Sequence, residues 1–161
     1  MFSFDESYYL GVVREVDTRK VSILVEDSNN LKKARVNQLI AAKLNIAYDY
    51  WLIGMIDKVI KSIVVSPTSI TEEEEELEYL EETVVNTVKV TFMGALKWDA
   101  SKQKNIFTRS VDHVPEIDTQ CFVLKDANLE VFMGHLSDEK DSKSLLELGV
   151  FKLDDKAKAL L

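Results

Sequence analysis

The stretch that decides the fold is Val88-Lys89-Val90-Thr91-Phe92-Met93-Gly94-Ala95-Leu96-Lys97. Val88, Val90, Phe92, Gly94 and Leu96 alternate with the residues between them, at a period of two. Side chains along a β-strand point in turn to the two faces of a sheet, so this period predicts a strand with one buried face. It is the clearest strand signal in the chain.

A β-hairpin is predicted near the N-terminus. Residues 8–16 are rich in β-branched and aromatic side chains, and Val21, Ile23 and Val25 recur at every second position. The intervening Asp17-Thr18-Arg19-Lys20 has turn chemistry, because an aspartate side chain can start a type I turn. Asp27-Ser28-Asn29-Asn30 is a second turn, which ends the hairpin.

The remaining segments are short. Residues 51–65 read as a strand with a bulge or sharp bend at Gly54, and Ser66-Pro67 is expected to end it. A short helix is predicted over 127–133, with Asp126 as N-cap and Gly134 just beyond its end. Residues 34–43 suit a strand or a short helix equally. Further strands are predicted at 106–111, 120–124 and 145–153, with a charged loop at 138–144.

Many short strands with few helices predict a mainly-β fold, a small closed β-barrel with one or two short helices. We expect this domain to span residues 1–153 and residues 154–161 to be a linker. Residues 68–83 form an expected acidic insertion, as a solvated loop or as a short helix over 72–82 that starts with a capping box at Thr71.

The net charge of −8 comes from one segment. The insertion holds eight glutamates (72–76, 78, 81 and 82) and no lysine or arginine, so the remainder of the chain is neutral. Strong DNA binding through phosphate neutralisation is therefore not expected. Phe92, Lys97, Trp98, Phe107 and Arg109 make only a sparse aromatic and basic pattern of the kind that binds single strands.

The sequence predicts no enzyme. None of the five glycines has a second glycine five residues later, which excludes a phosphate-binding P-loop. Cys121 lies in a predicted strand and reads as a buried structural thiol. His113 and His135 are too few for a histidine metal centre. The carboxylates Asp112, Glu116 and Asp118 flank a proline turn, where solvated carboxylates are common. No cofactor or metal is expected.

The sequence shows no signal peptide and no apolar run of the roughly 20 residues that a membrane span needs. One cysteine allows no internal disulfide, which suits a reducing compartment. A cytoplasmic protein without membrane contact is expected.

Six stretches of the chain together suggest a family resemblance. They are Gly11-Val12-Val13-Arg14-Glu15-Val16-Asp17, residues 21–26, Ile53-Gly54-Met55-Ile56-Asp57-Lys58-Val59, Asn105-Ile106-Phe107-Thr108-Arg109-Ser110-Val111, Pro115-Glu116-Ile117-Asp118 and Leu148-Gly149-Val150-Phe151-Lys152-Leu153. These stretches resemble the N-terminal barrel of HerA-type hexameric DNA-translocase ATPases. The family's barrel is named for its likeness to that of ATP synthase and precedes a RecA-like motor.

The resemblance implies a non-catalytic assembly and docking role. In the family the barrels crown a ring of six subunits and recruit an effector, either a nuclease or a sirtuin-like NAD-consuming enzyme, in DNA-end processing or anti-phage defence. ATP, magnesium and DNA bind the motor, which is expected to follow residue 161. Tyr50, Trp51 and Trp98 are the candidate partner-binding residues. The alternative is an OB-like domain that binds single- or double-stranded nucleic acid.

Overall fold

Antiparallel strands make up most of the computed structural model, which describes residues 2–46, 49–72, 75–137, 147–151 and 154–160. The strands are β1 (Tyr9–Asp17), β2 (Lys20–Leu24), β3 (Leu39–Leu44), β4 (Tyr50–Glu72), β5 (Glu75–Asp99), β6 (Lys104–Thr108), β7 (Gln120–Val123), β8 (Glu147–Phe151) and β9 (Asp154–Leu160). Within the described residues there are two short helices, α1 (Ser28–Leu31) and α2 (Asp126–Ser137).

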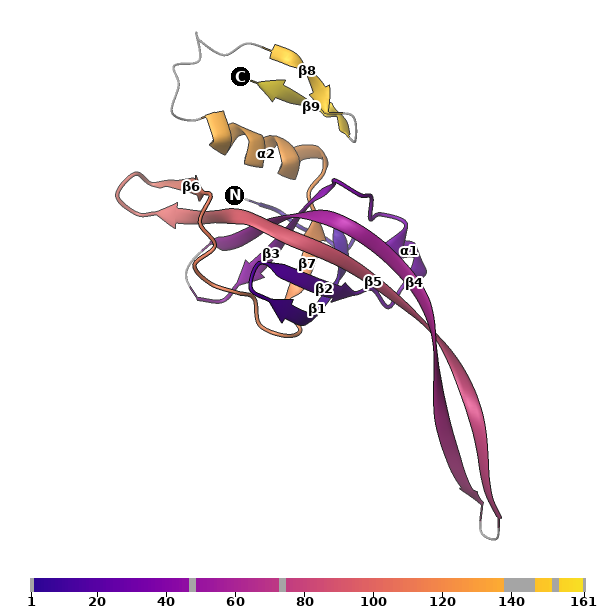
Figure 1. The fold of residues 1–161 in the computed structure, drawn as a ribbon. Helices are drawn as coiled ribbons and strands as arrows, with labels where there is room; N and C mark the ends of the chain where they lie inside the picture. The colour runs from indigo at the N-terminus through magenta and orange to yellow at the C-terminus, as the bar shows by residue number, and fades with distance from the viewer. Residues whose placement is uncertain (1, 47–48, 73–74, 138–146, 152–153, 161) are drawn as a thin grey trace.

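Seven of the strands form one sheet in the order β2-β1-β7-β3-β4-β5-β6. β5 also pairs with β2, from Lys20 opposite Thr91 to Leu24 opposite Thr87. The hydrogen bonding therefore returns almost to a ring. Figure 1 shows how these strands are arranged. β8 and β9 pair in a separate two-stranded sheet. The prediction of a mainly-β fold with one or two short helices is confirmed.

Apolar side chains fill both faces of the sheet. The larger cluster draws on six strands of the near-ring and includes Leu10, Ile23 and Phe92. We call it the inner cluster. The outer cluster joins the opposite face to α2 and includes Trp51, Leu129 and Phe132. Burial of apolar area on both faces is the main stabilising contribution to such a fold.

The predicted irregularity at Gly54 is confirmed as a β-bulge. Gly54 pairs with Phe92 and Ile53 pairs with Gly94, so Met93 is the extra residue. The bulge reverses the alternation that the sequence suggests, because it places Ala95 in the inner cluster and Leu96 in the outer one. The regular period of two therefore ends at Phe92 and does not continue to Leu96.

The prediction that Ser66-Pro67 ends a strand is wrong. β4 continues through Pro67 to Glu72 and pairs with β5, which begins at Glu75. Residues 68–72 and 75–83, expected to be a loop or a helix, are therefore strand. Each strand of a two-stranded ribbon has one open side, where the missing N–H of proline costs nothing. β-branched residues on both strands favour this pairing over a helix.

The structure settles the ambiguous segment 34–43, whose regular part is strand β3. The expected turn at 27–30 forms helix α1, with Asp27 accepting a hydrogen bond from the Asn29 backbone N–H at 2.8 Å. Helix α2 does not end before Gly134 but continues to Ser137. Residues 154–160, expected to be linker, form β9. The predicted loop at 138–144 lies outside the described residues.

Candidate interaction surfaces

The three predicted partner-binding residues lie in different environments. Tyr50 is buried in the inner cluster, and the Lys97 ammonium lies 4.9 Å from the centre of its ring. Trp51 is buried in the outer cluster. Trp98 is 41% exposed. Successive residues of β4 point to opposite faces, and both faces are covered, so Tyr50 and Trp51 do not form an exposed aromatic pair.

Trp51 is held by a buried polar network. Its indole Nε1–H donates to Asp49 Oδ1 at 2.7 Å, and the Asn105 side-chain amide donates to Asp49 Oδ2 at 2.6 Å. All three side chains are buried. Because both carboxylate oxygens are occupied within the protein, this aspartate has a structural role that ties the start of β4 to β6.

The residues considered for chemistry do not converge. Cys121 is fully buried, and the loss of solvation raises the pKa of its thiol to about 12, as expected for a structural cysteine. The His113 ring packs edge-on against Tyr50, whereas His135 lies in the last turn of α2. Among the described residues, no three histidine, cysteine or carboxylate side chains are grouped to hold a metal ion.

No described helix has the length and apolarity to cross a membrane.

The aromatic residues of the nucleic-acid pattern do not form a stacking platform. Phe92 is buried in the inner cluster, and Phe107 packs edge-on against Phe132 at 5.2 Å between ring centres. The Lys97 ammonium forms an ion pair with Asp112 at 3.0 Å. Trp98 and Arg109 are exposed.

A ribbon of β4 and β5 leaves the body of the protein. Past the pairing of Lys61 with Asn86, these strands have no other partner among the described strands. We call residues 62–72 and 75–85 the arm. Eleven strand residues extend about 35 Å, whereas a domain of this size has a radius of gyration of roughly 15 Å. Figure 1 shows the arm projecting well beyond the rest of the sheet.

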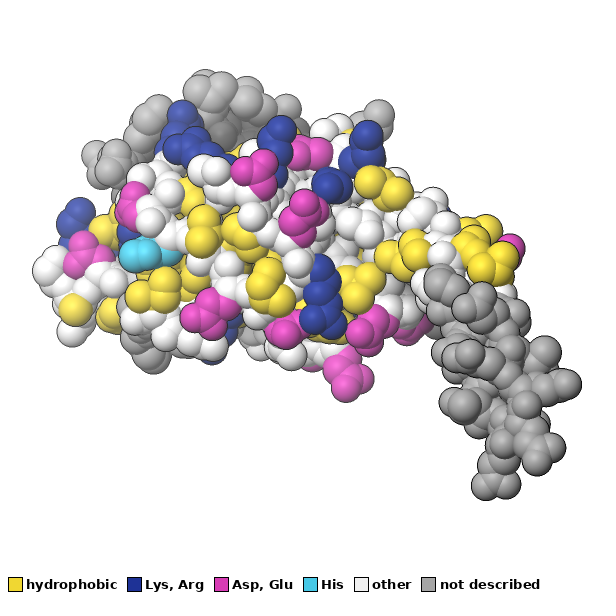
Figure 2. All heavy atoms as spheres, turned by 60° about the horizontal axis from the view of Figure 1, so that its bottom comes forward, with side chains coloured by type: hydrophobic (Ala, Val, Ile, Leu, Met, Phe, Trp, Pro, Cys, Tyr) yellow, Lys and Arg dark blue, Asp and Glu magenta, His cyan; other side chains and the backbone are white. Residues whose placement is uncertain are grey.

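One face of the arm is apolar and exposed. Residues directly opposite in an antiparallel pair share a face, and Ile63 lies opposite Val84. These side chains are 62% and 61% exposed, and Leu80, on the same face, is 72% exposed. In Figure 2, hydrophobic side chains gather along the described part of the arm. The same row of side chains on β5 continues to Val88 and Val90, which are buried in the inner cluster.

The sequence segment that contains the arm accounts for the net charge of the whole protein. All eight glutamates of the acidic segment lie within residues 62–85, without a lysine or arginine. The sequence contained the signal for this ribbon, since Ile63-Val64-Val65 and Thr83-Val84-Val85 are β-branched runs on either side of the glutamates. Repulsion between these glutamates favours a loop, but the pairing of β4 with β5 outweighs it in the described residues.

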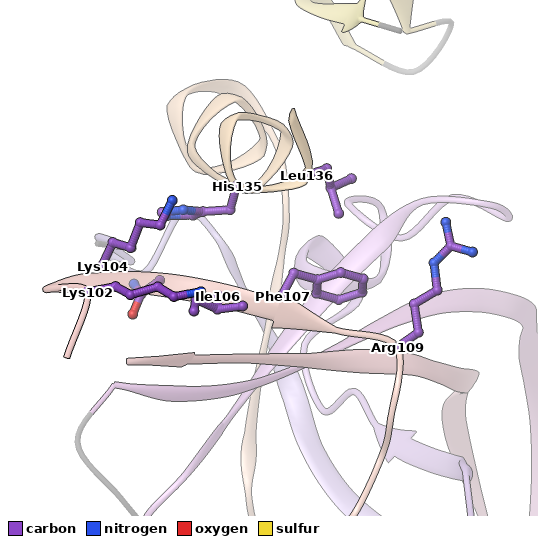
Figure 3. A pocket seen from close by; sticks show the side chains of 8 residues that line it. Lys102, Lys104, Ile106, Phe107, Arg109, His135 and Leu136 are labelled. Atoms are coloured by element: carbon purple, nitrogen blue, oxygen red, sulfur yellow. The ribbon is translucent and has the colours of Figure 1, made fainter. Parts of the chain in front are cut away.

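A basic groove lies at the other end of β5, between β6 and α2. It has a volume of about 240 Å³ and is lined by Lys102, Lys104, Asn105, Ile106, Phe107, Arg109, His135 and Leu136. Figure 3 shows Lys104 and His135 near one end, Arg109 at the other and Phe107 between them. None of the described residues that line it is acidic. The groove therefore combines positive charge with an apolar centre.

The comparisons with known proteins assign no family. No family model matches the chain, and no curated protein matches it.

Proposed function

We propose that this chain is a non-catalytic docking and assembly module. The observation that carries the proposal is the exposed apolar row of the arm, with Ile63, Leu80 and Val84. Solvent-exposed apolar patches rimmed by charge are typical of protein-binding surfaces. A two-stranded ribbon is also marginally stable by itself in water, so a partner that covers this face would stabilise it.

The finer proposal is that the near-ring is a closed β-barrel of the HerA type. Support comes from the return of β5 to β2 and from the resemblance of residues 11–17, 53–59 and 105–111. Such a barrel supports a hexameric ring and recruits an effector, a nuclease or a sirtuin-like NAD-consuming enzyme, in cytoplasmic anti-phage defence or DNA-end processing. ATP, magnesium and DNA would bind a separate motor and not these residues.

Site-specific photocrosslinking in cells tests the docking role. A photoreactive amino acid replaces Val84 on the arm, and the matched control replaces Ile117, an exposed apolar residue of the body. We expect position 84 to give discrete adducts, identified by mass spectrometry as a second copy of the chain or as an effector of the named classes. Adducts that do not differ between positions 84 and 117 would overturn the proposal.

The basic groove favours a second candidate function, nucleic-acid binding. Lys102 and Arg109 are exposed there, and Phe107 lies between the cationic side chains. Affinity through phosphates falls steeply with salt. Under the docking proposal, single- and double-stranded DNA and RNA should show no gel shift at low salt. A salt-sensitive shift that is lost in Lys102→Glu/Arg109→Glu would favour nucleic-acid binding instead.

A further inference from the structure

We propose that the acidic arm of one copy binds the basic groove between β6 and α2 of a second copy. The inference rests on the proposed docking function and specifies both sides of one contact.

The charge distribution selects the groove as the binding surface for the arm. The chain has 28 acidic and 20 basic residues, and the sequence segment 62–85 holds eight of the acidic residues with no basic one. Two arms therefore repel each other, whereas the groove presents the exposed Lys102 and Arg109, and no described residue of its lining is acidic. Complementary potentials of this kind set the orientation of a complex and speed its formation.

The apolar parts of the two surfaces also correspond. Leu80 projects from the arm on the same face as the exposed Glu82, two residues further along β5. In the groove, Phe107 and the exposed Leu136 lie among the cationic side chains. An apolar residue next to a carboxylate would thus meet an apolar surface bordered by cations, the usual division of an interface into an apolar centre and a polar rim.

The topology prevents the arm from reaching the groove of its own copy. The arm occupies the first part of β5, up to Val85, and β6 pairs with the last part, from Ala95 to Asp99. Ala95 lies ten positions after Val85, about 33 Å further along the strand. This intervening part of β5 is fixed by its pairing with β2 and β4. The arm points away from β6 in Figure 1.

The arm and the groove lie at opposite ends of β5, so the contact between two copies is head-to-tail. A head-to-tail contact repeats from copy to copy and gives a closed ring or an open filament, according to whether its rotation closes. The arm–groove contact would thus provide a specific means of building the proposed ring.

Sedimentation velocity of the full 161-residue chain tests the contact. We expect self-association that weakens with added salt, because the pairing is electrostatic. Lys102→Glu/Arg109→Glu should weaken it by at least about tenfold. The control, Arg19→Glu/Lys20→Glu, makes the same charge change at the exposed β1–β2 turn and should leave association unchanged. Circular dichroism checks that each variant is folded.

A charge-exchange experiment is the second part of the test. Glu78→Lys/Glu81→Lys/Glu82→Lys should also reduce self-association, and mixing this variant with Lys102→Glu/Arg109→Glu should restore mixed complexes. A monomeric wild-type chain, or equal behaviour of the groove and control variants, would overturn the inference. If effector adducts at position 84 persist in that case, the docking function stands and only the arm–groove contact fails.

Discussion

Val88 and Val84 point to the same face of β5, yet Val88 is completely buried and Val84 is 61% exposed. Residues four apart in a strand share a face. Opposite Val88, β5 pairs with Ile23 of β2, whereas at Val84 its described partner is β4 alone. The apolar row of the strand therefore leaves the core and continues along the arm, where it is available to another molecule.

The two valines should respond differently to the same substitution. Val88→Thr places a hydroxyl in the inner cluster and is expected to lower the free energy of unfolding by about 1–3 kcal/mol. Val84→Thr, on the exposed arm, should change it by less than about 0.5 kcal/mol. Urea denaturation of both variants at a concentration where the chain is monomeric measures the difference. Equal losses would mean that Val84 is covered within a single copy.

Alanine substitutions at two glycines should have opposite effects on the stability of the protein. A Cβ at Gly11 would lie 2.1 Å from the Leu24 carbonyl oxygen of the neighbouring strand, so Gly11→Ala must push β1 and β2 apart. At Gly134, inside α2, the Cβ meets nothing within 4 Å. Gly134→Ala should stabilise the protein by roughly 0.5–1 kcal/mol through lower chain entropy. Thermal unfolding should move down for the first variant and up for the second, and a rise for Gly11→Ala would contradict the β1–β2 pairing.

The buried network around Asp49 should depend on its carboxylate. Asp49→Ala leaves the Trp51 indole N–H and the Asn105 amide without acceptors, at a cost of at least about 2 kcal/mol. Asp49→Asn keeps one oxygen acceptor and also tolerates the positive φ of 50° at this position, so it should lose less. Denaturation followed by tryptophan fluorescence compares them, with Trp51→Phe as the control that removes the donor.

The thiol of Cys121 should be inert in the folded protein. Burial raises its pKa to about 12, so even at pH 9 almost none is thiolate, the reactive form. A disulfide reagent should modify it only after denaturant is added, with no detectable modification of the native protein at pH 7 or at pH 9. A native rate that rises with pH and has its midpoint near pH 8.5, like that of a free cysteine, would show that the site is open to solvent.

Local sequence signals correctly predicted much of the sheet. The alternation of Val21, Ile23 and Val25 identified β2, and Gly54 marked the bulge, because a period of two and the absence of a side chain are properties of the local chain. The end of α2 was misplaced at Gly134, since the packing of Leu129 and Phe132 on the sheet outweighs a glycine cost of about 1 kcal/mol.

The interaction surfaces were harder to predict. Tyr50 and Trp51 were chosen for their residue type, but burial depends on what covers each face of β4, which local sequence does not contain. For the arm, glutamate repulsion within the acidic segment favoured a loop, whereas pairing between residues up to 23 positions apart, such as Ser62 and Val85, decides that it is a ribbon.

The sequence by itself determined the composition of the acidic segment: eight glutamates within residues 62–85, no compensating cation, and a neutral remainder. Charge is a sum over residues and needs no fold. Only the tertiary structure decided that this charge is carried on an arm, that Val84 is exposed while Val88 is buried, and that Lys102, Arg109 and His135 border one groove. Those relations arise from pairing and packing between distant segments, which bring residues together irrespective of their separation along the chain.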